Sequence, residues 1–174
     1  MGRDFFLETE RVGFSKWRQD DIALASLLWG DPAVSRYICA GGVFRADDII
    51  NRLHTEIQNE TLYHVQYWPV FASAANHFIG CCGLRPYPAG GYELGFHLRP
   101  EFWGKGYAAE AAHAVITYAF ADLEAEKLFA GHHPDNHKSQ KLLQKLGFLY
   151  IGDEFYGPTG LYHPSYVLES HTRA

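Results

Sequence analysis

The stretch Glu93–Ala111 reads ELGFHLRPEFWGKGYAAEA and places a strand, a glycine loop and a helix in direct succession. Residues Tyr92–Leu98 have the alternating pattern of a strand, and an alanine-rich helix begins soon after Gly106. Such an order gathers backbone N–H groups at the positive end of a helix dipole. Gly104 and Gly106 permit positive φ and let a ligand approach the backbone closely. The stretch therefore predicts a site for a phosphate or pyrophosphate, and hence a nucleotide-containing cofactor.

The loop differs from the two most common phosphate-binding motifs. It lacks the third glycine of the dinucleotide fingerprint, and the Lys105 that follows Gly104 is not followed by Ser or Thr as in a P-loop. Lys105 can add positive charge from the side or extend into water. Taken alone, the loop is equally compatible with an ordinary strand-to-helix turn.

Further segments extend the pattern along the chain. They are FIGCCGL at 78–84, ELGF at 93–96, PEFWGKGYA at 100–108, NHKS at 136–139 and LGF at 146–148. In order and spacing these segments resemble the Gcn5-related N-acetyltransferase (GNAT) superfamily, and within it the ribosomal-protein N-terminal (RimJ/RimL-type) branch. The resemblance covers residues 11–168 and is most specific between 79 and 148.

Composition limits the class of protein. The chain has 174 residues, of which 47% are hydrophobic and 16% aromatic, enough for one domain with a sizeable core. The net charge of −5 argues against a nucleic-acid binder that depends on phosphate contacts. Neither a signal-peptide pattern nor an apolar run of membrane-spanning length is visible, so no membrane partner is expected.

The three cysteines indicate the redox setting. Cys39, Cys81 and Cys82 have no metal-binding or disulfide spacing, and neighbouring residues of a strand point to opposite faces. We expect all three to be small buried residues in a reducing, cytoplasmic setting.

Hydrophobic periodicity predicts the elements. The expected strands are 11–17, 63–71, 77–84, 92–98, 127–132, 150–156 and 161–168. Helices are expected from Asp20 or Asp21, from about Ala46, after Gly106, and from Asp135 or Asn136. Their apolar faces are expected to carry Leu24, Leu27 and Leu28; Ala46, Ile50, Leu53 and Ile57; Ala112, Val115, Ile116, Ala119 and Phe120; and Leu142, Leu143 and Leu146. Pro69 marks an edge strand or a bulge, and Gly147 fits the position after the last helix.

This order of elements predicts a single α/β (α+β) domain over residues 1–174 with a mixed, mostly antiparallel sheet. The strand–helix–strand unit at 92–132 supplies a parallel pair with a right-handed crossover. The resemblance adds that the sheet is twisted, that its central strands 92–98 and 127–132 splay apart, and that helices flank it.

The resemblance implies acetyl-CoA as the cofactor. Its pyrophosphate would lie on the backbone N–H groups of Trp103, Gly104, Lys105, Gly106, Tyr107 and Ala108. Its pantetheine arm would pair like an added strand with Phe96, His97 and Leu98, which needs a free strand edge, and the acetyl group would lie in the cleft of the splayed strands. Asn136 would hydrogen-bond the arm; a plain helix N-cap is the alternative, and both roles can coexist.

Two residues are the candidates for catalysis. The resemblance implies that Ser139 lies near the thioester sulfur and donates a proton to the leaving thiolate; a hydroxyl bonded to its own helix is the alternative. Glu93 is the candidate general base, against a solvated carboxylate at a strand end. A backbone N–H of the strand 96–98 would hold the oxyanion, and positioning would supply much of the rate.

Other groups suggest weaker alternatives. His132, His133 and His137 match no metal motif, so no metal is expected, and His133 is an alternative base. Aromatic side chains either line an acceptor site or pack in the core: Tyr37, Phe44, Tyr63, Tyr67, Trp68, Tyr156, Tyr162 and Tyr166. By resemblance the acceptor site is shaped by the first two helices, the loop 37–44 and the last hairpin.

The activity expected from the resemblance is an N-acetyltransferase. The acceptor is first a protein N-terminal amine and next a small-molecule amine such as an aminoglycoside or polyamine. An alternative outside the enzymes is a non-catalytic sensor module that binds acyl-CoA. The sequence leaves monomer and homodimer both open.

Overall fold

An eight-stranded sheet is the frame of the computed structural model, which describes residues 2–171. Its strands are β1 (Leu7–Glu8), β2 (Val12–Phe14), β3 (Tyr67–Ala72), β4 (His77–Pro86), β5 (Tyr92–Leu98), β6 (Lys127–Gly131), β7 (Leu149–Tyr156) and β8 (Leu161–Glu169). The order across the sheet is β1-β2-β3-β4-β5-β6-β8-β7. Only the pair β5–β6 is parallel. The predicted mixed, mostly antiparallel sheet is thus confirmed.

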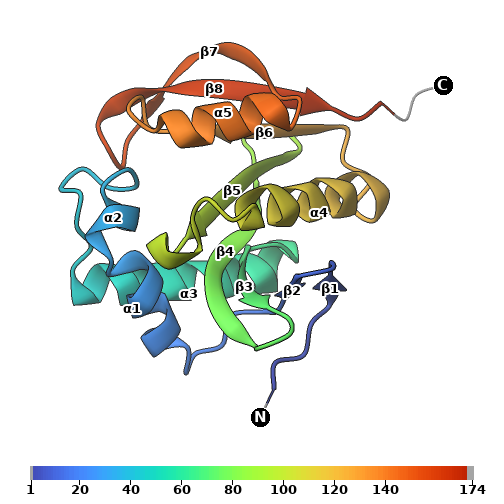
Figure 1. Ribbon diagram of the computed structural model, residues 1–174. Helices are drawn as coiled ribbons and strands as arrows, with labels where there is room; N and C mark the ends of the chain where they lie inside the picture. Colours follow the sequence, from blue (N-terminus) through green and yellow to red (C-terminus); the bar gives the residue numbers. More distant parts are fainter. Residues whose placement is uncertain (1, 172–174) are drawn as a thin grey trace.

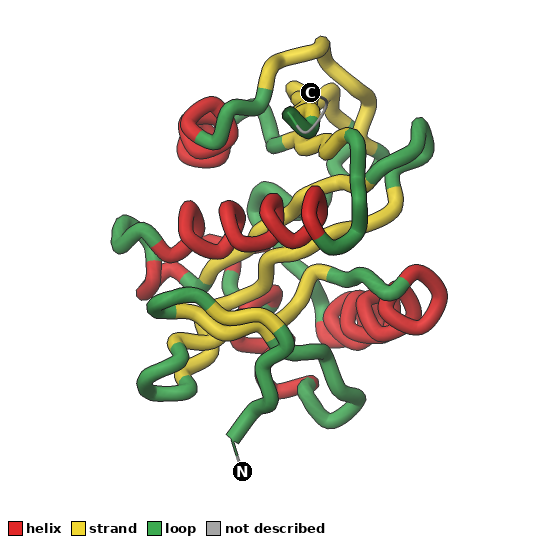
Figure 2. Tube along the Cα trace, turned by 90° about the vertical axis from the view of Figure 1, so that its right-hand side faces the viewer, coloured by secondary structure: helices red, strands yellow, loops and turns green. Residues whose placement is uncertain are grey.

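Helices cover both faces of this sheet. They are α1 (Ile22–Trp29), α2 (Pro32–Ser35), α3 (Ala46–Tyr63), α4 (Tyr107–Ala121) and α5 (His137–Lys145), with a 3-10 turn η1 (Pro100–Phe102). Figures 1 and 2 show α4 and α5 on one side of the sheet and α3 on the other. Each side has its own core, and Cys82 belongs to the first and Cys81 to the second. Their predicted opposite orientation is therefore confirmed. No helix within residues 2–171 is both long and apolar enough to cross a bilayer.

The centre of the sheet is open. β5 and β6 pair only at Tyr92 with Leu128 and at Glu93 with Phe129. Beyond Glu93, β5 continues along β4 as far as Leu98, while β6 continues along β8. The edge of β5 from residue 94 to 98 that faces β6 consequently has no strand partner. The predicted splay of the central strands is confirmed.

Helix ends follow local chemistry as expected. Asn136 caps α5, since its Oδ1 accepts a hydrogen bond from the Ser139 backbone N–H at 3.2 Å. Gly147 follows the helix at φ +90°. Its N–H donates to the Gln144 carbonyl and that of Phe148 to the Leu143 carbonyl, the two bonds of a Schellman motif.

Several predicted boundaries were wrong. α3 continues to Tyr63 and closes at His64 with φ 59°, so β3 begins at Tyr67 rather than at residue 63. The first predicted strand, 11–17, is hydrogen-bonded as a strand only at Val12–Phe14, because the Trp17 backbone N–H donates to the Gln66 side chain at 2.8 Å. The short elements β1 and α2 were missed.

Three residues predicted on apolar faces are exposed, and one proline is explained. Ala46 is exposed, Leu27 is 50% exposed and Ile50 is 39% exposed, whereas Leu28 and Leu53 are buried. Pro69 lies in β3, which pairs on both sides, so it does not mark an edge. A register shift between Val70 and Phe71 confirms the bulge instead.

Candidate active site

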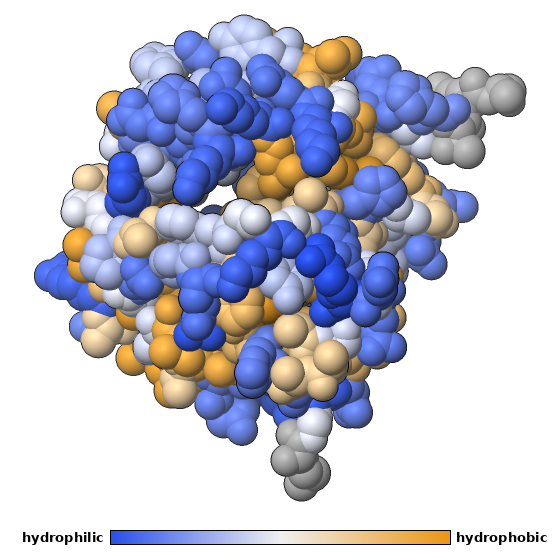
Figure 3. Space-filling view, viewed as in Figure 1, coloured by the Kyte–Doolittle hydropathy of each residue, from blue (hydrophilic) through white to orange (hydrophobic). Residues whose placement is uncertain are grey.

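A cavity of about 760 Å³ occupies the opening between β5 and β6. Its wall combines the loop before α4, the start of α5, the open edge of β5, and residues from α2, α3 and the β7–β8 hairpin. In Figure 3 a hollow lies below the mostly hydrophilic surface of α5. Every predicted site residue except Lys105 lines it: Glu93, Phe96, His97, Leu98, Trp103, Gly104, Gly106, Tyr107, Ala108, Asn136 and Ser139.

The glycine loop presents unpaired backbone donors to this cavity. Gly104 and Gly106 have φ of +72° and +82°, the left-handed region that glycine adopts without strain. Gly106 is the N-cap of α4 and has no side chain to cap the helix. Within residues 2–171, the N–H groups of residues 104–109 donate to no protein acceptor. These donors lie at the positive end of α4 and suit an anion such as a diphosphate.

Arg11 holds this loop from the outside. Its Nη1 donates to the Lys105 carbonyl at 2.9 Å, and its guanidinium carbon lies 4.6 Å from the centre of the Tyr107 ring. Its Nε donates to Glu110 Oε2 at 2.6 Å, and Thr9 Oγ1 donates to Oε1 at 2.6 Å. Burial alone would raise the pKa of Glu110, but the bonds from Thr9 and Arg11 outweigh it and lower that pKa. Sequence reasoning missed this clamp, because its partners are about a hundred positions apart and carry no shared motif.

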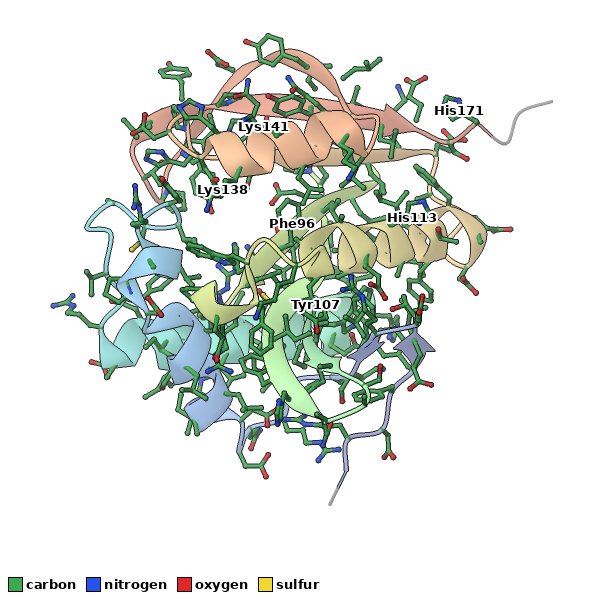
Figure 4. The ribbon with its side chains drawn as sticks, in the orientation of Figure 1. Phe96, Tyr107, His113, Lys138, Lys141 and His171 are labelled. Carbon is green, nitrogen blue, oxygen red and sulfur yellow. The ribbon has the colours of Figure 1, made fainter. Side chains whose placement is uncertain are left out.

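The loop is also tied to β5 and α5. Trp103 Nε1 donates to the Leu98 carbonyl at 2.8 Å. Lys138 extends from α5 toward the loop, with its Nζ 4.9 Å from the Trp103 ring centre, and Phe96 lies between α4 and α5 (Figure 4). Lys105, by contrast, is exposed and only its backbone takes part in the loop.

At the start of α5 lie the two predicted site residues of this helix. Ser139 and Asn136 both line it and are half-buried. Asn136 uses its Oδ1 for the cap, whereas its Nδ2 has no hydrogen-bond partner in the described part of the chain. The cap and a bond to a ligand are thus compatible.

Glu93 lies at the point where β5 and β6 part. It is half-buried and accepts a hydrogen bond from the Tyr67 hydroxyl at 2.8 Å, so it is not a freely solvated carboxylate. Burial, and then the negative charge of Glu93, raise the pKa of Tyr67 well above its usual value. Gly95 leaves room for the Tyr67 ring, since a Cβ at position 95 would overlap that ring.

Beneath Tyr67 lies a buried ionic group. Glu56 has no exposed surface and accepts hydrogen bonds from Arg52 Nε at 3.1 Å, from the Tyr67 backbone N–H at 2.8 Å, and from Arg85 Nη2. The Arg85 guanidinium carbon lies 4.2 Å from the Tyr67 ring centre. Burial and then the charges of Arg52 and Arg85 lower the pKa of His97, so its ring is neutral.

His133 lines the cavity, but one of its two ring nitrogens already has a hydrogen-bond partner. Its Nδ1 accepts a hydrogen bond from the Asp135 backbone N–H at 3.1 Å. The neutral ring therefore carries its proton on Nε2, which disfavours it as a base on that side. Within residues 2–171 no group of three or more His, Cys, Asp or Glu side chains could hold a metal ion.

The aromatic side chains divide between the cavity and the cores. Tyr37, Tyr67 and Tyr156 line the cavity, Trp68 and Tyr166 are buried in the core, and Tyr63 and Tyr162 are exposed. Phe44 packs against the core beside α3. Other lining residues were missed, because no motif marks them: Arg52, Arg85, Tyr87, Glu154 and His163.

Comparison with known proteins agrees with this geometry. Residues 11–149 match the acetyltransferase (GNAT) domain family. The chain is 31% identical over 150 residues to the N-acetyltransferase p20 of Bacillus licheniformis, covering 82% of this chain and 81% of that protein. It is 27% identical over 130 residues to the FsC-acetyl coenzyme A-N(2)-transacetylase of Aspergillus fumigatus, covering 70% of this chain and 55% of that protein.

A solved structure shares the fold at low identity. RimL, a ribosomal L7/L12 alpha-N-protein acetyltransferase in complex with coenzyme A, superposes with a TM-score of 0.79 at 14% identity, covering 95% of this chain and 98% of that one. The match of sequence over most of the chain, together with this fold, shows that the protein belongs to the GNAT family and is an N-acetyltransferase.

Proposed function

We propose that this N-acetyltransferase transfers an acetyl group from acetyl-CoA to a primary amine inside the cavity, and first of all to a protein N-terminal amine. One observation carries the proposal. A single cavity joins residues 104 and 106–109, whose N–H groups are unpaired, with the open edge of β5 and with Ser139 and Glu93.

The residues present fit acetyl-CoA. The diphosphate would lie on the N–H groups of the glycine loop, where the start of α4 favours negative charge. The pantetheine arm would run along the open edge of β5, with Asn136 Nδ2 as a further donor. The thioester would then reach the opening between β5 and β6, where Glu93 and Ser139 line the cavity.

The transfer assigns one task to each of these two side chains. Glu93 accepts a proton from the ammonium group of the acceptor, directly or through a water, and frees the nitrogen lone pair. The amine nitrogen adds to the thioester carbonyl carbon, a backbone N–H of β5 stabilises the resulting oxyanion, and the C–S bond then breaks as the carbonyl re-forms. Ser139 donates a proton to the departing thiolate and regains one from solvent. Since the pKa of a thiol is near 8.5, this last help accelerates the reaction without being indispensable.

The protein N-terminal amine is placed first on the strength of the structural neighbours. RimL acts on a ribosomal protein, and another neighbour, from Vibrio cholerae, is described as a putative ribosomal-protein-serine acetyltransferase with a TM-score of 0.78 at 18% identity. A small-molecule amine is the second candidate. The Aspergillus relative is named an N(2)-transacetylase of FsC and not an acetyltransferase of protein N-termini, which keeps this candidate open.

Thiol release tests the proposal. The protein is incubated with acetyl-CoA and a panel of N-terminal peptides, amino acids, polyamines and aminoglycosides. We expect turnover with at least one amine, and a loss of about a hundredfold in kcat for Glu93→Gln at pH 7. Tight coenzyme A binding without turnover on any acceptor would overturn the proposal. Unchanged kcat in Glu93→Gln would remove Glu93 as the base.

A further inference from the structure

The acceptor end of the cavity contains two arginines that the transfer reaction does not use. Arg52 comes from α3 and Arg85 from β4, and both line the cavity. Their side chains are only 13% and 24% exposed, so each charge is largely withdrawn from water. Burying a charge is costly unless it is paired, and the pairing of these two arginines is therefore informative.

The two guanidinium groups share one carboxylate. Both donate to Oε1 of Glu56, which has no exposed surface. Arg52 Nη2 and Arg85 Nε are buried and have no hydrogen-bond partner among the described residues. The two guanidinium groups and the single Glu56 carboxylate therefore have a net charge of +1, and two guanidinium N–H donors remain unused.

Glu93 balances that surplus from a distance. It is bonded to the Tyr67 hydroxyl and forms no ion pair with Arg52 or Arg85 within residues 2–171. Tyr67, His97, Cys81 and Tyr156 also interact with these charges. Burial is the largest cause of the pKa shift of each, and it shifts each pKa away from the charged form, so all four are neutral. The acceptor end thus has a positive side at the arginines and a negative side at Glu93.

We propose that the acceptor amine carries a carboxylate near its amino group, and that Arg52 and Arg85 bind this carboxylate while Glu93 faces the amine. The inference rests on the proposed transfer reaction and narrows its substrate class. Arginine presents a planar set of donors that matches a carboxylate. A polyamine or aminoglycoside would instead bring further positive charge beside two arginines. Free amino acids and peptides with an acidic first residue share the required chemistry.

Matched acceptors test the proposal on the native protein. Each of an α-, a β- and a γ-amino acid is compared with its own primary amide, and peptides that begin with Asp or Glu are compared with peptides that begin with Asn or Gln. We expect the carboxylate to raise kcat/KM by about tenfold or more in at least one pair, as a charged hydrogen bond would. The pair that responds distinguishes a free amino acid from a peptide. Equal or better use of the neutral partner in every pair would overturn the inference, while leaving the transfer reaction itself intact.

Substitutions then locate the effect. Arg52→Gln and Arg85→Gln should each lower the ratio of kcat/KM between carboxylate and amide toward one, with coenzyme A affinity within about twofold of the native value. Arg45→Gln, on the exposed start of the same helix α3 and outside the cavity, should leave the ratio unchanged. A folded variant of either buried arginine that keeps the full preference would contradict the assignment. If neither variant folds, the native comparison still decides.

Discussion

At the scale of single residues, the candidate site shows how one side chain serves two purposes. Asn136 caps α5 with Oδ1 and lines the cavity, while its Nδ2 has no hydrogen-bond partner among the described residues. Glu93 accepts a bond from Tyr67 and faces the same space. Gly95 contributes by having no side chain at all, since the Tyr67 ring fills the place of its Cβ. These assignments depend on atoms and can be tested one substitution at a time.

Ser139→Ala is the first such test. Removal of the hydroxyl takes away the proposed proton donor and hardly changes the shape of the cavity. We expect kcat to fall about tenfold. The loss should be smaller than in reactions where a general acid protonates a poorer leaving group, because a thiolate departs readily. The Kd for coenzyme A, measured by calorimetry, should change by less than about twofold. A parallel loss in kcat and affinity would indicate that Ser139 only binds.

At the scale of elements, the loop between η1 and α4 is held by groups from three directions. Arg11 fixes the Lys105 carbonyl, Trp103 bonds to the end of β5, and Lys138 approaches from α5. This support keeps unpaired N–H groups aimed at one place before a ligand arrives. Preorganisation of this kind reduces the entropy lost on binding.

Gly106→Val tests the loop. Its φ of +82° is unfavourable for valine by about 1–2 kcal/mol, and a Cβ there lies 3.2 Å from Arg11 Nη2, beside the proposed diphosphate. Coenzyme A affinity should fall at least about tenfold by calorimetric titration.

Gly90→Val is the matched control for backbone strain. Gly90 has φ +91°, no atom near its Cβ position, and no place in the cavity wall. It should lose similar stability but bind coenzyme A normally. Normal affinity in Gly106→Val would reject the placement of the diphosphate.

At the scale of the whole molecule, two cores meet at an open sheet. α4 and α5 pack on one face and α1 and α3 on the other, and the cavity at the opening between β5 and β6 is lined by Ala108 of α4 and by Arg52 of α3. Figures 1 and 2 show this arrangement. A cofactor from the side of α4 and an acceptor from the side of α3 would meet where the strands part. Buried histidines also make the stability of the whole fold depend on pH.

Acid should destabilise the protein through these histidines. Burial is the largest cause of a lowered pKa in His97, His132 and His163. The unfolded chain therefore binds more protons than the folded one below about pH 6.5, and stability falls as the pH drops through that value toward the folded pKa. Urea unfolding at pH 7.5 and pH 5.5 measures the effect. An unfolding free energy that does not fall between these two pH values would contradict it.

The sequence by itself determined the local parts of this protein. The strand 92–98, the glycine loop, the helix after it and the capped α5 depend on neighbouring residues, because backbone φ, helix dipoles and caps act over a few positions. The predicted start of β3 was wrong because α3 continues beyond the residues whose apolar periodicity predicted it. Among the elements within residues 2–171, seven of the eight strands and four of the five α-helices were predicted, and the missed ones are the shortest.

Only the tertiary structure decided which chemistry faces the acceptor. Arg52, Arg85 and Glu93 come from three elements and have no common motif, and Arg11 meets Glu110 across 99 positions. Burial set the charge states of Tyr67 and His97, and burial follows from packing rather than from sequence neighbours. Local backbone physics thus gave the proposed cofactor site its shape, whereas long-range packing assembled the charges that we propose select the substrate.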